Sequence, residues 1–275
     1  MFVLPLILSV AVAPFVLGQD NLPLEIEAVE AHFNNSGLVP SLLANFTPTA
    51  VFSLAFEGTD GTVQPGQAFT DKKVAPTPNL TITGGNFTAE ELFTLAMVDA
   101  GPVGSDQSQG QTRHWLVNGV TLTGEKAPFT VSTANGTAIT QYAGPAPPAG
   151  SGAHRYVILL YTQPSTFVAP EGLTEANIGV STFDFPAYVE SSHLGELVAG
   201  TYFTVEEGTA TASPSSTAPV VTSTLPAAVS PSKTGSSAAP SSTSPGDNQT
   251  GSASVSKVIS FSAVFAAVAA VVVLN

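Results

Sequence analysis

Residues 142–161 of the chain read Tyr142-Ala143-Gly144-Pro145-Ala146-Pro147-Pro148-Ala149-Gly150-Ser151-Gly152-Ala153-His154-Arg155-Tyr156-Val157-Ile158-Leu159-Leu160-Tyr161. The first part is rich in glycine and proline. Proline restricts the backbone, and glycine lets backbone N–H groups approach a ligand closely. The continuous apolar run Tyr156–Tyr161 is typical of a central strand. The stretch therefore predicts a rigid surface loop that feeds a buried strand.

On both sides of this stretch the pattern indicates further strands and one helix. The helix is expected at 23–33, with proline at its start, acidic residues in its first turn and a stop at Gly37. Strands are expected at 50–56, 80–83, 92–98, 114–120 and 197–205, with the fourth ending in a turn at Asn118-Gly119. We therefore predict one mainly β domain over residues 20–207, with a few peripheral helices.

Cationic and imidazole side chains are scarce, so their positions are informative. The whole chain has 7 Lys and Arg residues and 4 His residues. Two histidines neighbour arginines, in Arg113-His114 and His154-Arg155, and Asp99 ends an apolar run. Each lies near the end of a predicted strand, where loops collect functional groups. Two imidazoles and one carboxylate would form a small polar pocket, and Tyr156 lies on the same strand face as His154.

Imidazole N–H groups donate hydrogen bonds to phosphate oxygens, and histidine can gain a proton as an anion enters. Asp99 could orient an imidazole or accept from a ligand ammonium. A single histidine is more often structural than functional, so the argument depends on the grouping. His32, on the first helix, and His193, in a polar loop, are assigned no role.

The 142–156 segment closely resembles the signature loop of the phosphatidylethanolamine-binding protein (PEBP) family. That family has Tyr-x-Gly, two prolines and then Gly-x-Gly-x-His-Arg-Tyr at the start of a strand. Further matching segments are Phe46-Thr47-Pro48-Thr49, Val63-Gln64-Pro65-Gly66, Val98-Asp99, His114-Trp115-Leu116-Val117-Asn118 and 197–203. The resemblance spans about residues 22–206.

The resemblance implies a PEBP-like fold of antiparallel, Greek-key sheets and a small anion pocket. The family's pocket residues correspond to Asp99, His114, His154 and Tyr156, and we add Gly144 and Ala146 of the loop to the expected ligand-binding set. Family members bind phosphorylated headgroups; some inhibit serine carboxypeptidases, and some regulate kinases. As a class they are not established enzymes, so we expect no enzyme activity and no cofactor.

Two departures from the family pattern predict a more open pocket mouth. The family's Asp-Pro-Asp-Ala-Pro motif becomes Asp99-Ala100-Gly101-Pro102-Val103, which lacks the second acid. Thr112 stands two residues before the pocket histidine, where the family usually has an aromatic residue.

The two ends of the chain predict export and surface display. Residues 1–18 have the composition of a signal peptide; a buried N-terminal helix is the alternative. Residues 208–256, rich in Ser, Thr and Pro, indicate a disordered, O-glycosylated stalk. Residues 257–275 are expected to be a hydrophobic glycosylphosphatidylinositol (GPI) anchor signal with attachment at Asn248, Gly251 being the other candidate residue. The alternative is a retained tail-anchor helix.

Export also predicts N-glycosylation. Sequons occur at Asn34, Asn45, Asn79, Asn86, Asn135 and Asn248, the last of which we assign to anchor attachment. The chain has no cysteine, so no disulfide supports the domain. Its net charge of −13 argues against nucleic acid, which needs a basic face.

These observations favour a cell-surface binding module for a small phosphorylated ligand or lipid headgroup, held at the membrane by a GPI anchor. One alternative is an inhibitor of a secreted or vacuolar-type protease, acting through residues 20–40. Another is a structural cell-wall glycoprotein with a vestigial pocket. A metalloenzyme would need Asp99, His114 and His154 as ligands, but their spacing matches no metal motif, and no serine or cysteine nucleophile motif accompanies them.

Overall fold

The structure, a computed structural model, describes residues 21–59, 61–70, 73–88, 90–210, 220 and 225. All of them belong to one compact unit, Met1–Val229. The signal peptide (1–18), the anchor signal (257–275) and Asn248 lie outside the described residues, as does nearly all of the stalk (208–256). No helix among the described residues is long and apolar enough to span a bilayer.

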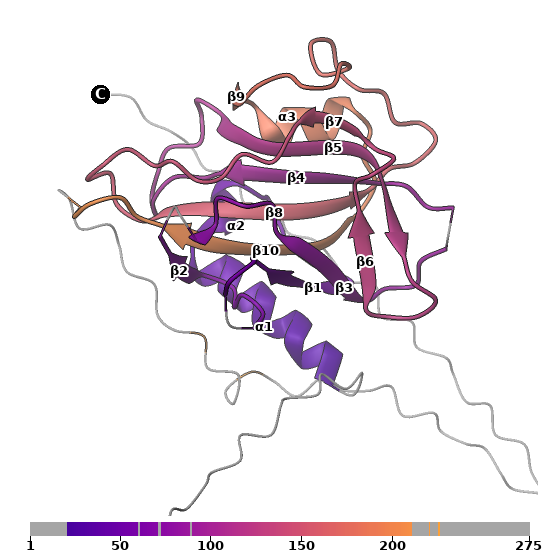
Figure 1. Ribbon diagram of the computed structural model, residues 1–275, viewed down its shortest axis with the longest axis horizontal. Helices are drawn as coiled ribbons and strands as arrows, with labels where there is room; N and C mark the ends of the chain where they lie inside the picture. The colour runs from indigo at the N-terminus through magenta and orange to yellow at the C-terminus, as the bar shows by residue number, and fades with distance from the viewer. Residues whose placement is uncertain are drawn as a thin grey trace, which may run out of the picture. The chain divides into compact units, whose positions relative to one another are not determined.

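The unit is built on a ten-stranded, mainly antiparallel sheet, as Figure 1 shows. The strands are β1 (Ala50–Ala55), β2 (Gln67–Phe69), β3 (Asn79–Gly84), β4 (Phe93–Asp99), β5 (Gln111–Thr123), β6 (Phe129–Ser132), β7 (Thr137–Thr140), β8 (His154–Thr162), β9 (Ser181–Phe183) and β10 (Leu197–Val205). Their order is β1-β3-β6-β5-β4-β8-β10-β2, and β7 and β9 also pair with β5. Among the described pairs, β10 with β2 is parallel and the others are antiparallel. The mainly β prediction with few helices is confirmed.

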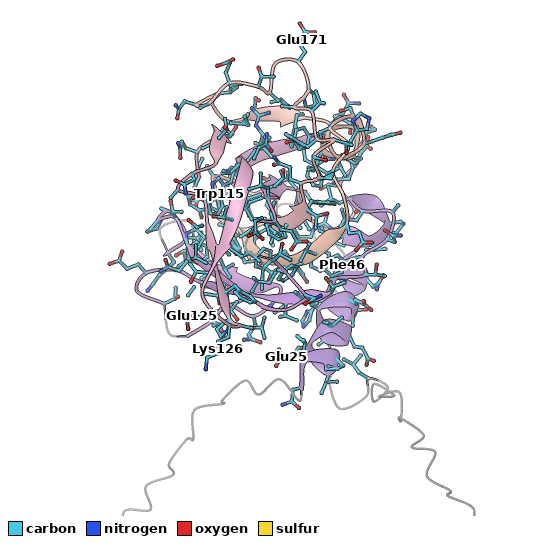
Figure 2. All side chains as sticks on the ribbon, turned by 90° about the vertical axis from the view of Figure 1, so that its right-hand side faces the viewer. Glu25, Phe46, Trp115, Glu125, Lys126 and Glu171 are labelled. Carbon is cyan, nitrogen blue, oxygen red and sulfur yellow. The ribbon has the colours of Figure 1, made fainter. Side chains whose placement is uncertain are left out.

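Three helices accompany the sheet: α1 (Leu22–Asn35), α2 (Leu38–Ser41) and α3 (Phe185–Ser191). Helix α1 begins with Pro23 in its first turn, as predicted, and buries Val29 and Phe33. The ring of Phe33 stacks on Phe46 with centroids 3.8 Å apart. Figure 2 places the labelled Phe46 beside α1, so the segment after α2 closes the helix against the sheet.

The long strands are buried on both faces. In β8, Tyr156, Ile158 and Leu160 join one apolar cluster with β1, β3 and β10, whereas Val157, Leu159 and Tyr161 join a second cluster with the helices. Because successive side chains of a strand point to opposite faces, one continuous apolar run serves both clusters. We call these the inner face and the helix-covered face.

The predicted turn at Asn118-Gly119 is wrong. Strand β5 continues to Thr123: it pairs with β4 up to Val120 and then with β6 over Thr121–Thr123. Gly119 has φ 75°, a backbone conformation that is readily open to glycine. Glycine therefore bends the strand from one part of the sheet to the next instead of ending it.

The predicted helix and the other predicted strands agree with the structure, and β10 matches at both ends. Strands β2, β6, β7 and β9 and helices α2 and α3 were not predicted. Each of these strands is only 3 or 4 residues long. Segments this short carry too few residues to display an alternation of apolar and polar side chains.

Charged side chains lie mainly at the margins of the domain. Figure 2 shows Glu125 and Lys126 at the β5–β6 turn and Glu171 at the tip of the loop between β8 and β9, all pointing outward. The sequon residues of the domain, Asn34, Asn45, Asn79, Asn86 and Asn135, are exposed. Their exposure is what glycosylation would require.

Candidate functional site

The adjacent ends of β4 and β8 bring Asp99 and His154 together. Asp99 pairs with Tyr156 across the two strands. Nδ1 of His154 lies 2.8 Å from Oδ2 and 3.1 Å from Oδ1 of Asp99. Their side chains are 13% and 12% exposed. The backbone N–H of Gly101 donates to Oδ1 of Asp99 at 2.7 Å, so the residue at the position of the missing second acid helps to hold the first.

A β-bulge turns His114 toward the same place. Trp115 faces the inner cluster, so strict alternation would put His114 on the helix-covered face. The register with β4 shifts between the pairs Met97–Trp115 and Val98–Arg113, which leaves His114 as the extra residue. Its ring meets the edge of Tyr156 at a centroid distance of 5.2 Å. The bulge therefore joins His114 to Asp99, His154 and Tyr156, a group that we call the Asp99 cluster.

Burial and a backbone hydrogen bond hold the imidazole of His114 in place. It is 6% exposed, and its Nδ1–H donates to the carbonyl oxygen of Ala143 at 3.0 Å. Burial lowers the pKa of His114, and the bond to Ala143 and the charge of Asp99 oppose that effect. With Nδ1 protonated, Nε2 carries a lone pair and can take up a proton when an anion arrives.

Tyr156 supplies a buried donor. Its ring lies between His154, at 6.5 Å, and Phe203, at 5.7 Å, and the residue is 0% exposed. The hydroxyl has no hydrogen-bond partner in the described part of the chain. Burial raises the pKa of Tyr156, and the nearby carboxylate of Asp99 raises it further. An unpaired buried hydroxyl is costly, so a ligand that accepts its proton would remove the cost.

The loop 142–153 closes over the cluster and is fastened at both ends. The N–H of Ala143 donates to the carbonyl of His114 at 2.9 Å, and that of Gly150 donates to Glu207 at 2.8 Å. A Cβ at Gly144 would lie 2.8 Å from Cα of Ala75. Any larger residue at position 144 would therefore clash with the backbone of Ala75. The backbone of Ala146 lies near the hydroxyl of Tyr156.

Ser151 joins this site, and the sequence analysis missed it. Its Oγ lies 2.8 Å from Nε2 of His154 and 2.6 Å from the carbonyl oxygen of Pro148. Both nitrogens of His154 are thus engaged, one by Asp99 and one by Ser151. The signal in the sequence is a serine in a glycine-flanked turn three residues before His154, which by itself is too common to be specific.

Arg155 stabilises the site from the other face of β8. The residue is 1% exposed and donates to four carbonyl oxygens. Nε donates to Gly101 at 2.9 Å, Nη2 to Ala100 at 2.9 Å and to Pro102 at 3.0 Å, and Nη1 to Ser36 at 2.6 Å. The guanidinium therefore fixes the three residues after Asp99 and ties them to the end of α1. Burial lowers the pKa of Arg155.

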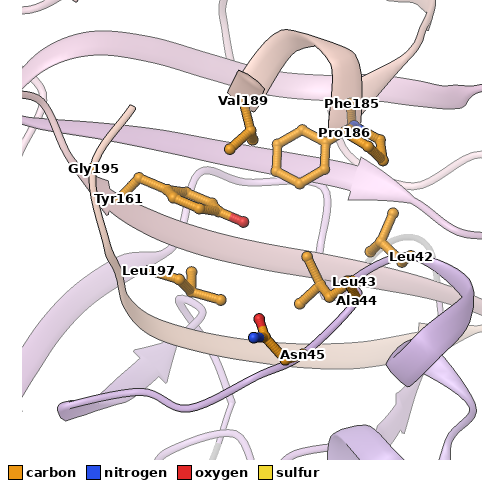
Figure 3. Close-up of a pocket in the computed structure, with 10 residues that line it drawn as sticks. All are labelled: Leu42, Leu43, Ala44, Asn45, Tyr161, Phe185, Pro186, Val189, Gly195 and Leu197. Carbon is orange, nitrogen blue, oxygen red and sulfur yellow. The ribbon is translucent and has the colours of Figure 1, made fainter. Parts of the chain in front are cut away.

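Two cavities lie outside the Asp99 cluster. One of about 300 Å³ is lined mainly by apolar side chains of α3, the 42–45 segment and β10 (Figure 3). The other, of about 490 Å³, lies between α1, β1 and residues 62–65. Neither includes a member of the Asp99 cluster. Within the described ranges, no three His, Cys, Asp or Glu side chains are arranged to hold a metal ion.

Comparisons with known proteins show the family and the fold of the chain. The chain is 29% identical over 174 residues to the 26 kDa secreted antigen of Toxocara canis, covering 62% of each protein. It is 33% identical over 97 residues to phomoidride biosynthesis cluster protein N of Talaromyces stipitatus, covering 33% of this chain and 47% of that protein. The chain thus spans less than two thirds of the length of these two relatives.

Among solved structures, the fold is similar to that of the carboxypeptidase Y inhibitor in complex with its cognate proteinase. The TM-score is 0.54 at 24% identity, covering 66% of this chain and 96% of the inhibitor. The sequence pattern of the family described as phosphatidylethanolamine-binding protein matches residues 57–211, more than half of the chain. The chain therefore belongs to the phosphatidylethanolamine-binding protein family.

Proposed function

We propose that the protein is a surface-displayed binding module whose Asp99 cluster takes a small anion, either a phosphate or the phosphorylated headgroup of a lipid. The observation that carries the proposal is the hydroxyl of Tyr156, which is buried and unpaired, on a ring that contacts the imidazole of His114. A phosphate oxygen would accept from Tyr156, and a second would accept from His114 once it is protonated.

The charges near the site make this binding depend on protons. Asp99 is negative and repels an anion, but its contact with His154 at 2.8 Å offsets that charge when the imidazole is protonated. His114 is neutral because burial lowers its pKa. An entering anion favours the protonated form, so ligand binding should take up a proton at His114.

The test is calorimetric titration of the purified protein with phosphorylethanolamine and, separately, with inorganic phosphate. We expect saturable binding that Tyr156→Phe weakens by about tenfold, corresponding to the loss of one hydrogen bond to a charged group. Tyr161→Phe is the matched control because Tyr161 lies on the helix-covered face of the same strand. His154→Ala should also weaken binding. Absence of saturable binding of both ligands to the folded protein would exclude this function.

Comparing the two ligands separates two sources of the anion. Equal affinities would assign the site to phosphate itself, and tighter binding of phosphorylethanolamine would favour a lipid headgroup, with Asp99 accepting from the ammonium. Repeating the titration in buffers of different ionisation enthalpy measures proton uptake. Binding without proton uptake would contradict the role given to His114.

Surface display is part of the same proposal. The antigen of Toxocara canis is named as secreted, and the ends of this chain have the composition of export and anchor signals. Phosphatidylinositol-specific phospholipase C should release the protein from intact cells, and a peptide N-glycosidase should lower its apparent mass. Retention of the protein after phospholipase treatment would favour a tail-anchor helix instead.

A second candidate function is inhibition of a serine carboxypeptidase. The similar fold of the carboxypeptidase Y inhibitor favours it, although an identity of 24% supports the fold alone. A carboxypeptidase Y activity assay with the purified protein tests it directly. Inhibition that survives Tyr156→Phe and is lost on removal of residues 20–40 would separate this function from anion binding.

A further inference from the structure

Three side chains at the rim of the site lie in the order of a serine hydrolase triad. Oγ of Ser151 is 2.8 Å from Nε2 of His154, and Nδ1 of His154 is 2.8 Å from Oδ2 of Asp99. In such triads the nucleophile meets one imidazole nitrogen and the orienting carboxylate meets the other. The same three roles recur on unrelated folds, so geometry identifies them rather than sequence order.

The surroundings of Ser151 suit a nucleophile. The residue is exposed and lies in a turn between Gly150 and Gly152, which have φ 78° and 95°. Small neighbours on a sharp turn leave the hydroxyl open to a substrate. His154 and Asp99 are 13% and 12% exposed, so the base is reachable and the carboxylate is largely shielded from water.

We propose that Ser151, His154 and Asp99 act as nucleophile, general base and orienting carboxylate, and that the protein hydrolyses small carboxylic esters. The proposal needs these three side chains alone and does not rest on anion binding. It goes beyond the binding function because a covalent acyl intermediate would form on the protein.

The reaction balances without a cofactor. Oγ of Ser151 attacks the ester carbonyl carbon while its proton passes to Nε2 of His154. The bond from carbon to the leaving oxygen then breaks, and that oxygen takes the proton and departs as the alcohol. Water attacks the acyl-serine, gives a proton to His154, and the carboxylic acid leaves as the proton returns to Ser151.

One contact of Ser151 slows the proposed hydrolysis, and one neighbouring hydroxyl assists it. The carbonyl oxygen of Pro148, 2.6 Å from Oγ, competes with His154 for the hydroxyl proton, so slow turnover is expected. The unpaired hydroxyl of Tyr156, whose ring stacks on that of His154 with centroids 6.5 Å apart, is a donor for the oxyanion that forms on the substrate. Covalent labelling is therefore a more sensitive test than turnover.

The first experiment treats the intact protein with a fluorophosphonate probe and locates the adduct by mass spectrometry. We expect an adduct on Ser151 that is absent in Ser151→Ala and forms at least about tenfold more slowly in His154→Gln. Ser108→Ala is the matched control because Ser108 is an exposed serine whose hydroxyl donates to Asp106 at 2.8 Å, a carboxylate instead of a histidine. Loss of p-nitrophenyl acetate hydrolysis should follow the loss of the adduct.

If His154→Gln does not fold, a second variant, which keeps His154, tests the same contact. The chain has no cysteine, so Ser151→Cys introduces a single thiol. An imidazole at hydrogen-bond distance stabilises the thiolate, so iodoacetamide should alkylate Ser151→Cys at pH 6 at least about tenfold faster than Ser108→Cys.

Equal alkylation rates, or a folded protein with no adduct on Ser151, would overturn the proposal and leave Ser151 as a structural partner of His154. Adduct formation with no phosphate binding would support the triad and exclude the anion site. Phosphate binding with no adduct on Ser151 would support the anion site and exclude the triad.

Discussion

The two histidine–arginine pairs of the molecule use the same residue types in different ways. In β5 the order is Arg113-His114, and in β8 it is His154-Arg155. Both imidazoles belong to the Asp99 cluster, and both arginines, on the other side of their strands, are 1% exposed. Both nitrogens of His154 contact side chains, those of Asp99 and Ser151, whereas His114 donates from Nδ1 to the backbone carbonyl of Ala143.

The arginines differ in what they hold. Arg155 donates to four backbone carbonyls in the 100–102 loop and at Ser36. Arg113 donates to Thr140 at 2.6 Å and to Gly179 and Ser181 at 3.2 Å each, and its guanidinium lies 5.1 Å from the centre of the Phe183 ring. Arg155 therefore ties the site to α1, whereas Arg113 fastens β9 at the edge of the sheet. A buried arginine can thus be satisfied by carbonyls and hydroxyls alone.

The largest effect is expected from Arg155→Met. The variant removes four buried hydrogen bonds to carbonyl oxygens, three of which keep a second donor from Gln107, Ser105 or the backbone N–H of residue 155. We expect a loss of about 4 kcal/mol in the free energy of unfolding. Urea denaturation followed by fluorescence of Trp115 measures it. Lys73→Met is the control because Lys73 is exposed and only approaches the carbonyl of Gly58 at 3.4 Å. A loss below 1 kcal/mol would mean that water replaces the guanidinium.

Arg113→Met should cost less, about 2–3 kcal/mol, because its contacts are fewer and longer than those of Arg155. The same urea titration compares the two variants directly. A loss equal to or above that of Arg155→Met would contradict the assignment of Arg155 as the main clamp.

Thr140→Val isolates one contact of Arg113. Oγ1 of Thr140 accepts from Nε of Arg113 at 2.6 Å and donates to the carbonyl of Ile178 at 3.0 Å. Valine keeps the shape and removes both bonds, so we expect a loss of about 1–2 kcal/mol. The double variant with Arg113→Met should lose less than the sum of the two single variants, and strict additivity would show that the contact carries no free energy.

The smallest effect concerns His114 and pH. Its pKa is lowered in the folded protein, so the unfolded chain binds a proton more readily; stability is full above the unfolded pKa of about 6.5 and falls as the pH drops below it. His114→Asn should therefore reduce the loss of stability between pH 7 and pH 5 by roughly 1 kcal/mol.

Urea titrations at both pH values measure this change. His32→Gln is the comparison because burial also lowers the pKa of His32, which is only half-buried. If His114→Asn loses as much stability on acidification as the unmodified protein, His114 is not held neutral by burial.

Much of the fold could be predicted because the long elements carry strong patterns. Strands β8 and β10 are apolar over most of their length, and α1 has its proline, acidic residues and apolar face in the expected places. Strands β2 and β9 could not be found because each gains its conformation from pairing with a longer strand. The contacts that stabilise such a strand depend on the side chains of its partner as well as its own, so its own sequence does not reveal it.

In the candidate site, too, some residues could be placed from the sequence and others could not. Asp99, His154 and Tyr156 could be placed together because each lies at a recognisable strand end and alternation fixes the face of Tyr156. His114 could be named from its motif, but its direction depends on a bulge opposite Met97 and Val98. Ser151 gave no specific signal, since its role arises from a distance to His154 that a turn creates.

The amino-acid sequence by itself determined the family, the long strands, the identities of the Asp99 cluster and the acidic, cysteine-free character of the chain, because these follow from residue type and local spacing. Only the tertiary structure decided the bend at Gly119, the inward turn of His114, the reach of Arg155 to Ser36 and the contact of Ser151 with His154. The physical reason is that each of these depends on a register or a hydrogen bond between segments distant in the chain, and no local propensity specifies which partners will meet.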